Sequence, residues 1–195
     1  MKSVVIIGKG PSVLKSTKAF VDSFDEVAIC NFPPMEKYQH LISNRAQYHF
    51  LNAGDPLPYS RDFLNGLGLI HIFNTSQFIH LPHWDTDQFM PDHKVFYYSD
   101  YGYKIKKEYE DKRGFWPSTG IMALDYFFKS EEHHKISLVG FDLMSPDKPP
   151  YYFPMEEGNP NHQAEGYIRS GHGDVDTQRN LIKELSKEKE IVWLQ

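Results

Sequence analysis

Val4-Val5-Ile6-Ile7-Gly8-Lys9-Gly10-Pro11-Ser12 lies near the start of the chain and decides its fold. Four consecutive Val and Ile residues are typical of a parallel strand that is covered on both faces. The glycines that follow allow the backbone to turn sharply and to approach a ligand closely, and Pro11 suits the first turn of a helix. The stretch is not a dinucleotide fingerprint, because Val13 takes the place of the last glycine, and it lacks the end of a P-loop. A turn without a ligand is the alternative interpretation.

Six further apolar runs of strand length alternate with segments of helical spacing. The runs are residues 27–31, 48–51, 69–73, 95–98, 136–139 and 191–194, and the helical segments are 12–24, 121–128 and 177–187. Basic and acidic residues mix between Lys104 and Arg113, which we interpret as the solvated face of another helix. The alternation predicts the α/β class, with one doubly wound, Rossmann-like and mostly parallel sheet in a single domain spanning residues 1–195.

Residues 145–169 do not fit regular structure, because they are rich in proline and contain Tyr151, Tyr152 and Tyr167. A structureless loop of about 25 residues is uncommon in a compact domain, and its aromatic content favours an ordered lid. The loop follows a predicted strand that ends in Gly140-Phe141-Asp142. Since open α/β sheets bind ligands at the carboxyl ends of their strands, we expect this aromatic, proline-rich lid to cover a site there.

The composition excludes several classes of protein. Of 195 residues, 40% are hydrophobic and 15% aromatic, as in a globular domain. No apolar run approaches the roughly 20 residues of a transmembrane segment, and the opening residues are too few for a secretory signal. A net charge of −5 argues against a general affinity for nucleic acid. Cys30 is the only cysteine, which suits a cytoplasmic protein; a peripheral position at the inner face of the membrane stays open.

Pro117-Ser118-Thr119-Gly120 precedes the apolar run Ile121–Leu124 and predicts a turn that opens a helix. The first N–H groups of a helix have no partner within it, and here two hydroxyl groups stand beside them. Such a turn is a candidate site for a phosphate or a carboxylate.

His172 lies between two glycines, just before a predicted helix, and is a candidate general base at neutral pH. Asp174-Val175-Asp176 has the Asp-x-Asp spacing with which many glycosyltransferases hold a divalent metal on a sugar nucleotide, and Asp85-Thr86-Asp87 repeats it. Capping of the helix explains the first pair equally well. His80-x-x-His83 and His133-His134 lack the further ligands of a zinc site.

Taken in order, these motifs resemble those of the sialyltransferases. Residues 117–124 followed by 136–142 are similar to the short sialyl motif of the animal enzymes. The whole chain is similar to the bacterial lipooligosaccharide sialyltransferases of glycosyltransferase family 42. The residues that match that family pattern are Gly8, Gly10, Pro11 and Ser12 after the first strand, Cys30 and Asn31 after the second, Asn52 after the third, the turn of Ser118, Thr119 and Gly120, the lid tyrosines Tyr151, Tyr152 and Tyr167, and Gly171 and His172 before Asp176.

The resemblance implies one Rossmann-like domain, a variant of the GT-A type, that transfers sialic acid from CMP-sialic acid with inversion and without a metal or other cofactor. The implied ligand contacts are Gly8, Gly10, Asn31, Asn52, Ser118, Thr119 and Gly120 around CMP and the sugar carboxylate, with Lys9, Pro11, Ser12 and Asp142 beside them. The lid tyrosines would hydrogen-bond the departing phosphate, and His172 would take the proton of the acceptor. The implied partners are a CMP-sugar, a glycan acceptor such as lipooligosaccharide, and further copies of the chain.

Lys9 departs from the family pattern, which has Asn at this position. A lysine there can pair with the phosphate or the donor carboxylate, or point to solvent, so the donor stays open between sialic acid and another ulosonic acid such as Kdo. Two alternatives stay open as well: a metal-dependent transferase of UDP- or GDP-sugars that uses Asp174 and Asp176, and a nucleotide- or glycan-binding module without turnover. The chain is short for the family, and we expect no separate membrane-association tail.

Overall fold

The computed structural model describes residues 1–31, 34–52, 61–76, 96–143 and 171–194, together with residues 145, 147, 149 and 151–153. Its centre is a seven-stranded sheet in which every pair of neighbours is parallel, in the order β5-β4-β3-β2-β1-β6-β7. The strands are β1 (Lys2–Ile7), β2 (Glu26–Cys30), β3 (Tyr48–Leu51), β4 (His71–Asn74), β5 (Phe96–Tyr98), β6 (His133–Val139) and β7 (Glu190–Trp193). The predicted α/β sheet is therefore confirmed, and all seven predicted runs form strands, with ends that shift by a few residues.

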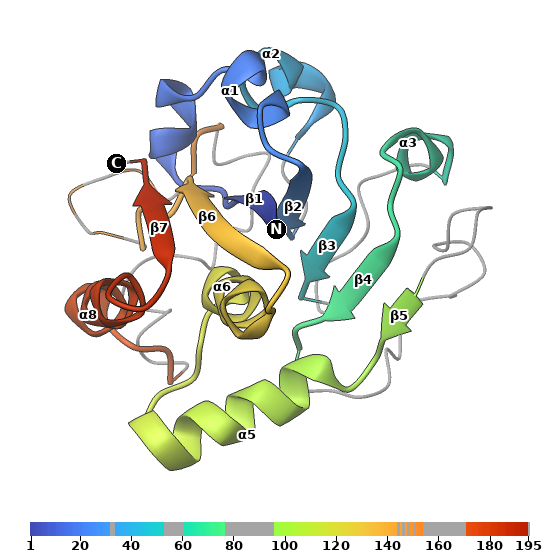
Figure 1. Ribbon diagram of the computed structural model, residues 1–195. Helices are drawn as coiled ribbons and strands as arrows, with labels where there is room; N and C mark the ends of the chain where they lie inside the picture. Colours follow the sequence, from blue (N-terminus) through green and yellow to red (C-terminus); the bar gives the residue numbers. More distant parts are fainter. Residues whose placement is uncertain are drawn as a thin grey trace.

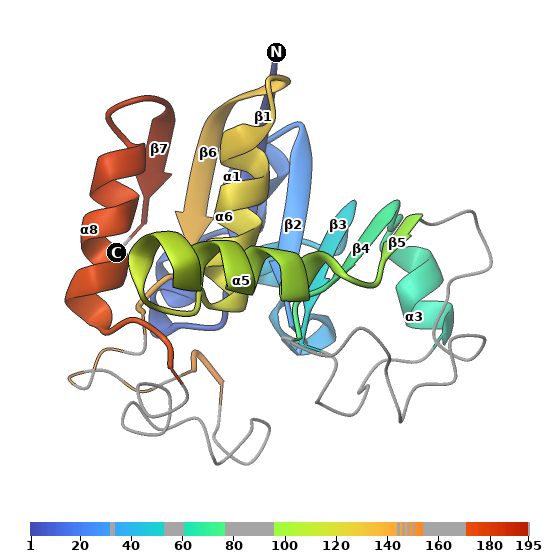
Figure 2. The same ribbon diagram turned by 90° about the horizontal axis from the view of Figure 1, so that it is seen from below.

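Helices cover both faces of the sheet (Figures 1 and 2). One face carries α5 (Tyr101–Arg113), α6 (Thr119–Lys129) and α8 (Val175–Leu185), and the other carries η1 (Pro11–Lys15), α1 (Lys18–Asp22), η2 (Glu36–Tyr38), α2 (Gln39–Ile42) and α3 (Arg61–Gly66). Successive side chains of a strand point to opposite faces. Val4 and Ile6 of β1 accordingly pack in the core under α6, whereas Val5 and Ile7 pack in the core under α1 and α2.

The predicted helix over residues 12–24 is wrong in one respect, because the structure divides it into η1 and α1. Ser16 and Thr17 between them are extended, with ψ of 168° and 154°. The Thr17 side chain accepts a hydrogen bond from the Phe20 N–H and so begins a new helix. Ser and Thr compete with the helix backbone for hydrogen bonds, which makes them better caps than interior residues.

The mixed-charge segment forms α5, as expected. Its exposed Lys104, Lys112 and Arg113 pair with Asp100, Glu108 and Glu184, so three of its five positive charges are matched on the surface. No helix within the described ranges is long and apolar enough to cross a lipid bilayer.

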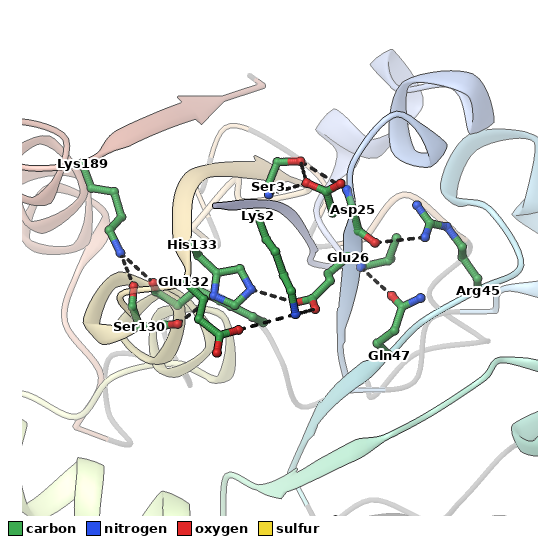
Figure 3. A network of polar contacts seen from close by, with 12 residues as sticks. Lys2, Ser3, Asp25, Glu26, Arg45, Gln47, Ser130, Glu132, His133 and Lys189 are labelled. Atoms are coloured by element: carbon green, nitrogen blue, oxygen red, sulfur yellow. Dashed lines mark hydrogen bonds and ion pairs between the residues drawn. The ribbon is translucent and has the colours of Figure 1, made fainter.

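Side chains fix both ends of α6, its own cap residue at the start and a lysine from another segment at the end. At its start, the Ser118 hydroxyl accepts from the Ile121 N–H at 3.2 Å. At its end, the Lys189 ammonium donates to the carbonyl groups of Phe127, Phe128 and Ser130 at 3.1, 2.7 and 2.7 Å, and Figure 3 shows Lys189 directed at Ser130. A cation on the last carbonyls of a helix satisfies acceptors that have no partner within it. Lys189 thereby ties α6 to the start of β7.

The amino ends of β1, β2 and β6 meet in a polar cluster (Figure 3). Glu26 accepts from the Lys2 ammonium at 2.7 Å, and its second oxygen lies 2.7 Å from Nε2 of the buried His133. Nδ1 of His133 lies 2.8 Å from the Ser130 hydroxyl. The cluster holds three adjacent strands together, β2, β1 and β6, at the end of the sheet opposite their carboxyl ends.

Replacing Glu26 by Gln is expected to destabilise the fold at pH 7 by about 2 kcal/mol. Burial by itself would raise the pKa of Glu26, but hydrogen bonds from Lys2, His133 and Tyr48 outweigh burial, so that its pKa is lowered. A carboxylate whose pKa is lowered in the folded state stabilises the fold above its unfolded pKa of about 4.3, and this contribution is lost as the pH falls through the folded pKa. Urea unfolding of both proteins between about pH 7 and pH 3 should therefore show a shrinking difference. A constant difference would contradict the assignment.

Candidate functional site

The carboxyl ends of all seven strands lie along one edge of the sheet, and the order of the strands reverses there between β1 and β6. From β1 the chain proceeds outward to β5, and it then returns to place β6 on the other side of β1 (Figure 1). Ligands of open α/β sheets bind outside the carboxyl ends of the strands at such a reversal. The two loops at this point are the predicted motifs Gly8–Ser12 and Gly140–Asp142.

These two loops are joined directly to each other. The N–H of Gly10 donates to the Gly140 carbonyl at 2.9 Å, and Oδ2 of Asp142 accepts from both the N–H and the hydroxyl of Ser12, at 2.8 and 2.7 Å. A Cβ at Gly10 would lie 2.4 Å from Oδ2 of Asp142, and a Cβ at Gly8 would lie 2.5 Å from the Gly140 oxygen. The close approach that these glycines allow is therefore an approach of the β1 loop to the β6 loop.

Asn31 and Asn52 follow the neighbouring strands β2 and β3 and contact each other. Oδ1 of Asn31 accepts from the Asn52 N–H at 2.8 Å. Because Oδ1 of Asn31 is the acceptor in this contact, the other polar atom of its side chain is the NH₂ nitrogen, which is a donor. No acceptor for this NH₂ group lies among the described residues. A primary amide can donate and accept at once, as recognition of a base or a ribose requires.

The start of α6 presents unused donors beside the same edge. The Ser118 hydroxyl caps the helix and donates to Oε1 of Gln178 at 3.3 Å, and Oγ1 of Thr119 lies 3.0 Å from Oγ1 of Thr75. Within the part of the chain that the structure describes, the N–H groups of Thr119 and Gly120 donate no hydrogen bond. They form the positive end of an eleven-residue helix, which suits an anion.

His172 is oriented by the backbone of a distant segment. Its Nδ1 lies 3.0 Å from the Trp116 carbonyl oxygen, and the Trp116 N–H donates to the Gly171 carbonyl at 2.9 Å. A carbonyl oxygen can only accept, so Nδ1 carries the proton in the neutral ring and Nε2 carries the lone pair. Gly171 has φ of +89°, a conformation that favours glycine. The geometry is that of an imidazole whose Nε2 can take a proton.

Gln178 and Thr75 contribute to this edge, and the sequence did not identify them. Gln178 is almost fully buried on α8; it accepts from Ser118 and donates to the Gly173 carbonyl at 2.7 Å, so that it joins the start of α6 to the His172 loop. Thr75 follows β4 and touches Thr119. The available signal in the sequence was the position of Gln178, a polar residue at helical spacing from the apolar Leu181 and Ile182.

Tyr151 and Tyr152 are both buried in the core under α1 and α2. The Tyr152 N–H donates to the Lys9 carbonyl at 3.0 Å, and the Lys9 ammonium lies 4.8 Å from the centre of the Tyr151 ring. The first part of the predicted lid is therefore attached to the β1 loop through Lys9. Tyr167 and most of residues 145–169 lie outside the described residues, and so do Asp85, Asp87, His80 and His83.

Asp174, the first residue of the Asp-x-Asp pair, caps α8 as its position predicts. Asp174 accepts from the Thr177 N–H at 2.7 Å, which is the main cause of its lowered pKa, and Asp176 pairs with Arg179 at 2.6 Å. No group of three or more His, Cys, Asp or Glu side chains within the described ranges is arranged to hold a metal ion.

Solved structures share this fold over the whole chain. A mammalian sialyltransferase in complex with Gal-beta-1-3GalNAc-ortho-nitrophenol is 16% identical with a TM-score of 0.64, covering 98% of this chain and 68% of that one. The sialyltransferase CstII from Campylobacter jejuni, in complex with the substrate analogue CMP-3FNeuAc, is 17% identical with a TM-score of 0.59, covering 100% and 82%. The sialyltransferase CST-II in complex with a trisaccharide acceptor and CMP is 17% identical with a TM-score of 0.56, covering 99% of this chain and 81% of that one. Neither a family model nor a curated protein matches the chain.

These likenesses confirm the resemblance in the sequence at the level of the fold. The chain has the single-sheet, Rossmann-like α/β fold of the sialyltransferases, at a sequence identity of 16 to 18%.

Proposed function

We propose that the protein transfers sialic acid, or a related ulosonic acid, from a CMP-sugar to a hydroxyl group of a glycan, with inversion at the anomeric carbon. The observation that carries the proposal is the arrangement at the strand reversal between β1 and β6. Amide groups of Asn31 and Asn52, helix N–H groups at Thr119 and Gly120, and an oriented His172 lie along one edge of a sheet with the sialyltransferase fold.

Each part of the arrangement has a task in such a transfer. The asparagine amides suit the nucleoside, and the start of α6 suits the carboxylate of the sugar. Lys9 brings a positive charge to the β1 loop, where it can balance charge on the departing phosphate. Tyr151, Tyr152 and Tyr167 remain the candidates for a hydrogen bond to that phosphate. Neutral donors and a lysine together would make a metal unnecessary.

In the proposed reaction the acceptor oxygen attacks the anomeric carbon from the face opposite the phosphate. The bond between that carbon and the phosphate oxygen breaks, and its electron pair leaves with CMP. Nε2 of His172 takes the proton of the acceptor hydroxyl, because Nδ1 is occupied as a donor to Trp116. The site therefore has to align the nucleophile on one face and stabilise a leaving group on the other.

Calorimetric titration with CMP in EDTA, beside UDP with manganese, tests this proposal. We expect saturable binding of CMP without metal. Binding of UDP alone, and only with manganese, would overturn the proposal and make Asp174 and Asp176 the residues to replace. If CMP binds, CMP release from CMP-sialic acid and CMP-Kdo, with galactose-terminated acceptors, identifies the donor. Binding without release from either donor, with any acceptor, would instead favour a module without turnover.

A further inference from the structure

His49 is a fully buried polar residue in the otherwise apolar strand β3. Its Nε2 lies 2.6 Å from the carbonyl oxygen of Asn31. Because that oxygen can only accept, Nε2 must carry a proton. Burial lowers the pKa of His49 to about 4, against the opposing effect of this hydrogen bond, so the ring is neutral near pH 7 with its single proton directed at Asn31.

Asn31 has an unusual backbone conformation at the carboxyl end of β2. Its φ is +56°, in the left-handed region that few residues other than glycine adopt, although Asn tolerates it better than most. Such a conformation persists only where surrounding contacts impose it. Contacts with neighbouring residues must therefore hold Asn31 in this conformation.

Three contacts from β3 and the residue after it impose this conformation. The Asn31 N–H donates to the Phe50 carbonyl at 2.6 Å, its carbonyl accepts from His49, and its Oδ1 accepts from the Asn52 N–H at 2.8 Å. The first is a continuation of the ladder between β2 and β3, and the third uses a side-chain atom of Asn31. Among the described residues, only His49 contacts the carbonyl of Asn31, and this contact therefore sets the direction in which the chain leaves β2.

We propose that His49 is a positioning residue for the nucleotide: it fixes the Asn31 peptide so that the Asn31 NH₂ group is presented at the carboxyl edge of the sheet. The inference rests on the proposed function for the identity of the ligand. If the His49 contact is lost, Asn31 can leave the left-handed conformation. Its Oδ1 then moves away from the Asn52 N–H, and both asparagines lose their alignment.

Two variants distinguish the effect of the hydrogen-bond donor of His49 from the effect of its side-chain volume. His49→Leu fills the same apolar space without a donor, whereas His49→Gln keeps an N–H donor near the position of Nε2. His133→Gln is the matched control, because it alters a buried histidine at the opposite end of the sheet. For each variant we would measure CMP affinity by calorimetry, the unfolding free energy in urea, and amide hydrogen exchange at Asn52.

We expect His49→Leu to weaken CMP binding about tenfold and to accelerate exchange at Asn52 by a similar factor, since one oriented hydrogen bond is lost at each place. His49→Gln should keep most of the CMP affinity and most of the protection of the Asn52 N–H from exchange. His133→Gln should lower stability while leaving CMP affinity unchanged. In this pattern, CMP affinity and exchange at Asn52 depend on the hydrogen-bond donor at position 49 and not on the stability of the fold.

Two results would overturn the inference. One is exchange at Asn52 that is unchanged in His49→Leu. The other is a loss of CMP affinity that is equal in His49→Leu and His49→Gln and follows their loss of stability. If the wild-type protein does not bind CMP, the proposed function fails, but exchange at Asn52 still decides whether His49 positions Asn31.

Discussion

His172→Ala is expected to lower the rate of sugar transfer by about 10² to 10⁴-fold, which is the usual contribution of a general base. The affinity for CMP should stay unchanged. His172 is held by the Trp116 carbonyl through Nδ1, and its backbone pairs with Trp116, so removal of the ring leaves the path of the chain intact. Steady-state rates of CMP release, with calorimetry on the same samples, measure both quantities.

His134→Ala is a suitable control, because His134 is an exposed histidine on the far end of β6. It should leave both rate and affinity at their wild-type values. If His172→Ala lost CMP binding together with activity, the role of His172 would be structural. If the rate were unchanged, another group would have to accept the proton.

Gly10→Ala is expected to lower the free energy of unfolding by about 2 to 4 kcal/mol and to weaken CMP binding. The added Cβ would lie 2.4 Å from Oδ2 of Asp142 and 2.8 Å from the Gly140 oxygen. One of these is backbone, so the β1 and β6 loops have to separate. That movement would break the two hydrogen bonds between Ser12 and Asp142. Urea unfolding and CMP titration give the two effects independently.

Gly66→Ala is the matched control for this substitution. Gly66 ends α3, and a Cβ there would meet no atom of the described residues within 4 Å. Its stability should be unchanged or higher by about 0.4 to 1 kcal/mol, because alanine restricts the unfolded chain more than glycine does. A Gly10→Ala protein as stable as the wild type would contradict the tight contact of the two loops. Reduced stability with full CMP affinity would instead place the nucleotide away from the β1 turn.

Much of the fold was predictable because its signals are local. Runs rich in Val and Ile mark the buried strands β1 and β6. Ser118 and Asp174 mark the starts of α6 and α8, where each caps its helix as its position predicts. The break between η1 and α1 was also local in origin, but Thr17 acts as a cap only when the chain departs from helical geometry at Ser16. Helical spacing alone does not reveal such a departure.

The sequence predicted which residues lie at the carboxyl edge of the sheet, but only part of the contacts between them. The motif after β1 suggested glycines that approach a ligand, whereas the structure brings Gly8 and Gly10 against the β6 loop. Asp142, predicted beside the substrate, holds Ser12 across 130 positions of sequence. Tyr151 and Tyr152 pack in the core. Each of these contacts joins segments that are far apart in the sequence, so no periodicity or spacing could predict them.

The sequence by itself determined the α/β class, the positions of the strands and the resemblance to sialyltransferases, because burial of apolar runs and helix capping depend on neighbouring residues. Only the tertiary structure decided that Trp116 orients His172, that Gln178 joins two loops, and that His49 holds Asn31. The physical reason is the parallel sheet. It brings the ends of strands from the whole chain to one edge, where the partner of each polar group is set by strand order and not by distance along the sequence.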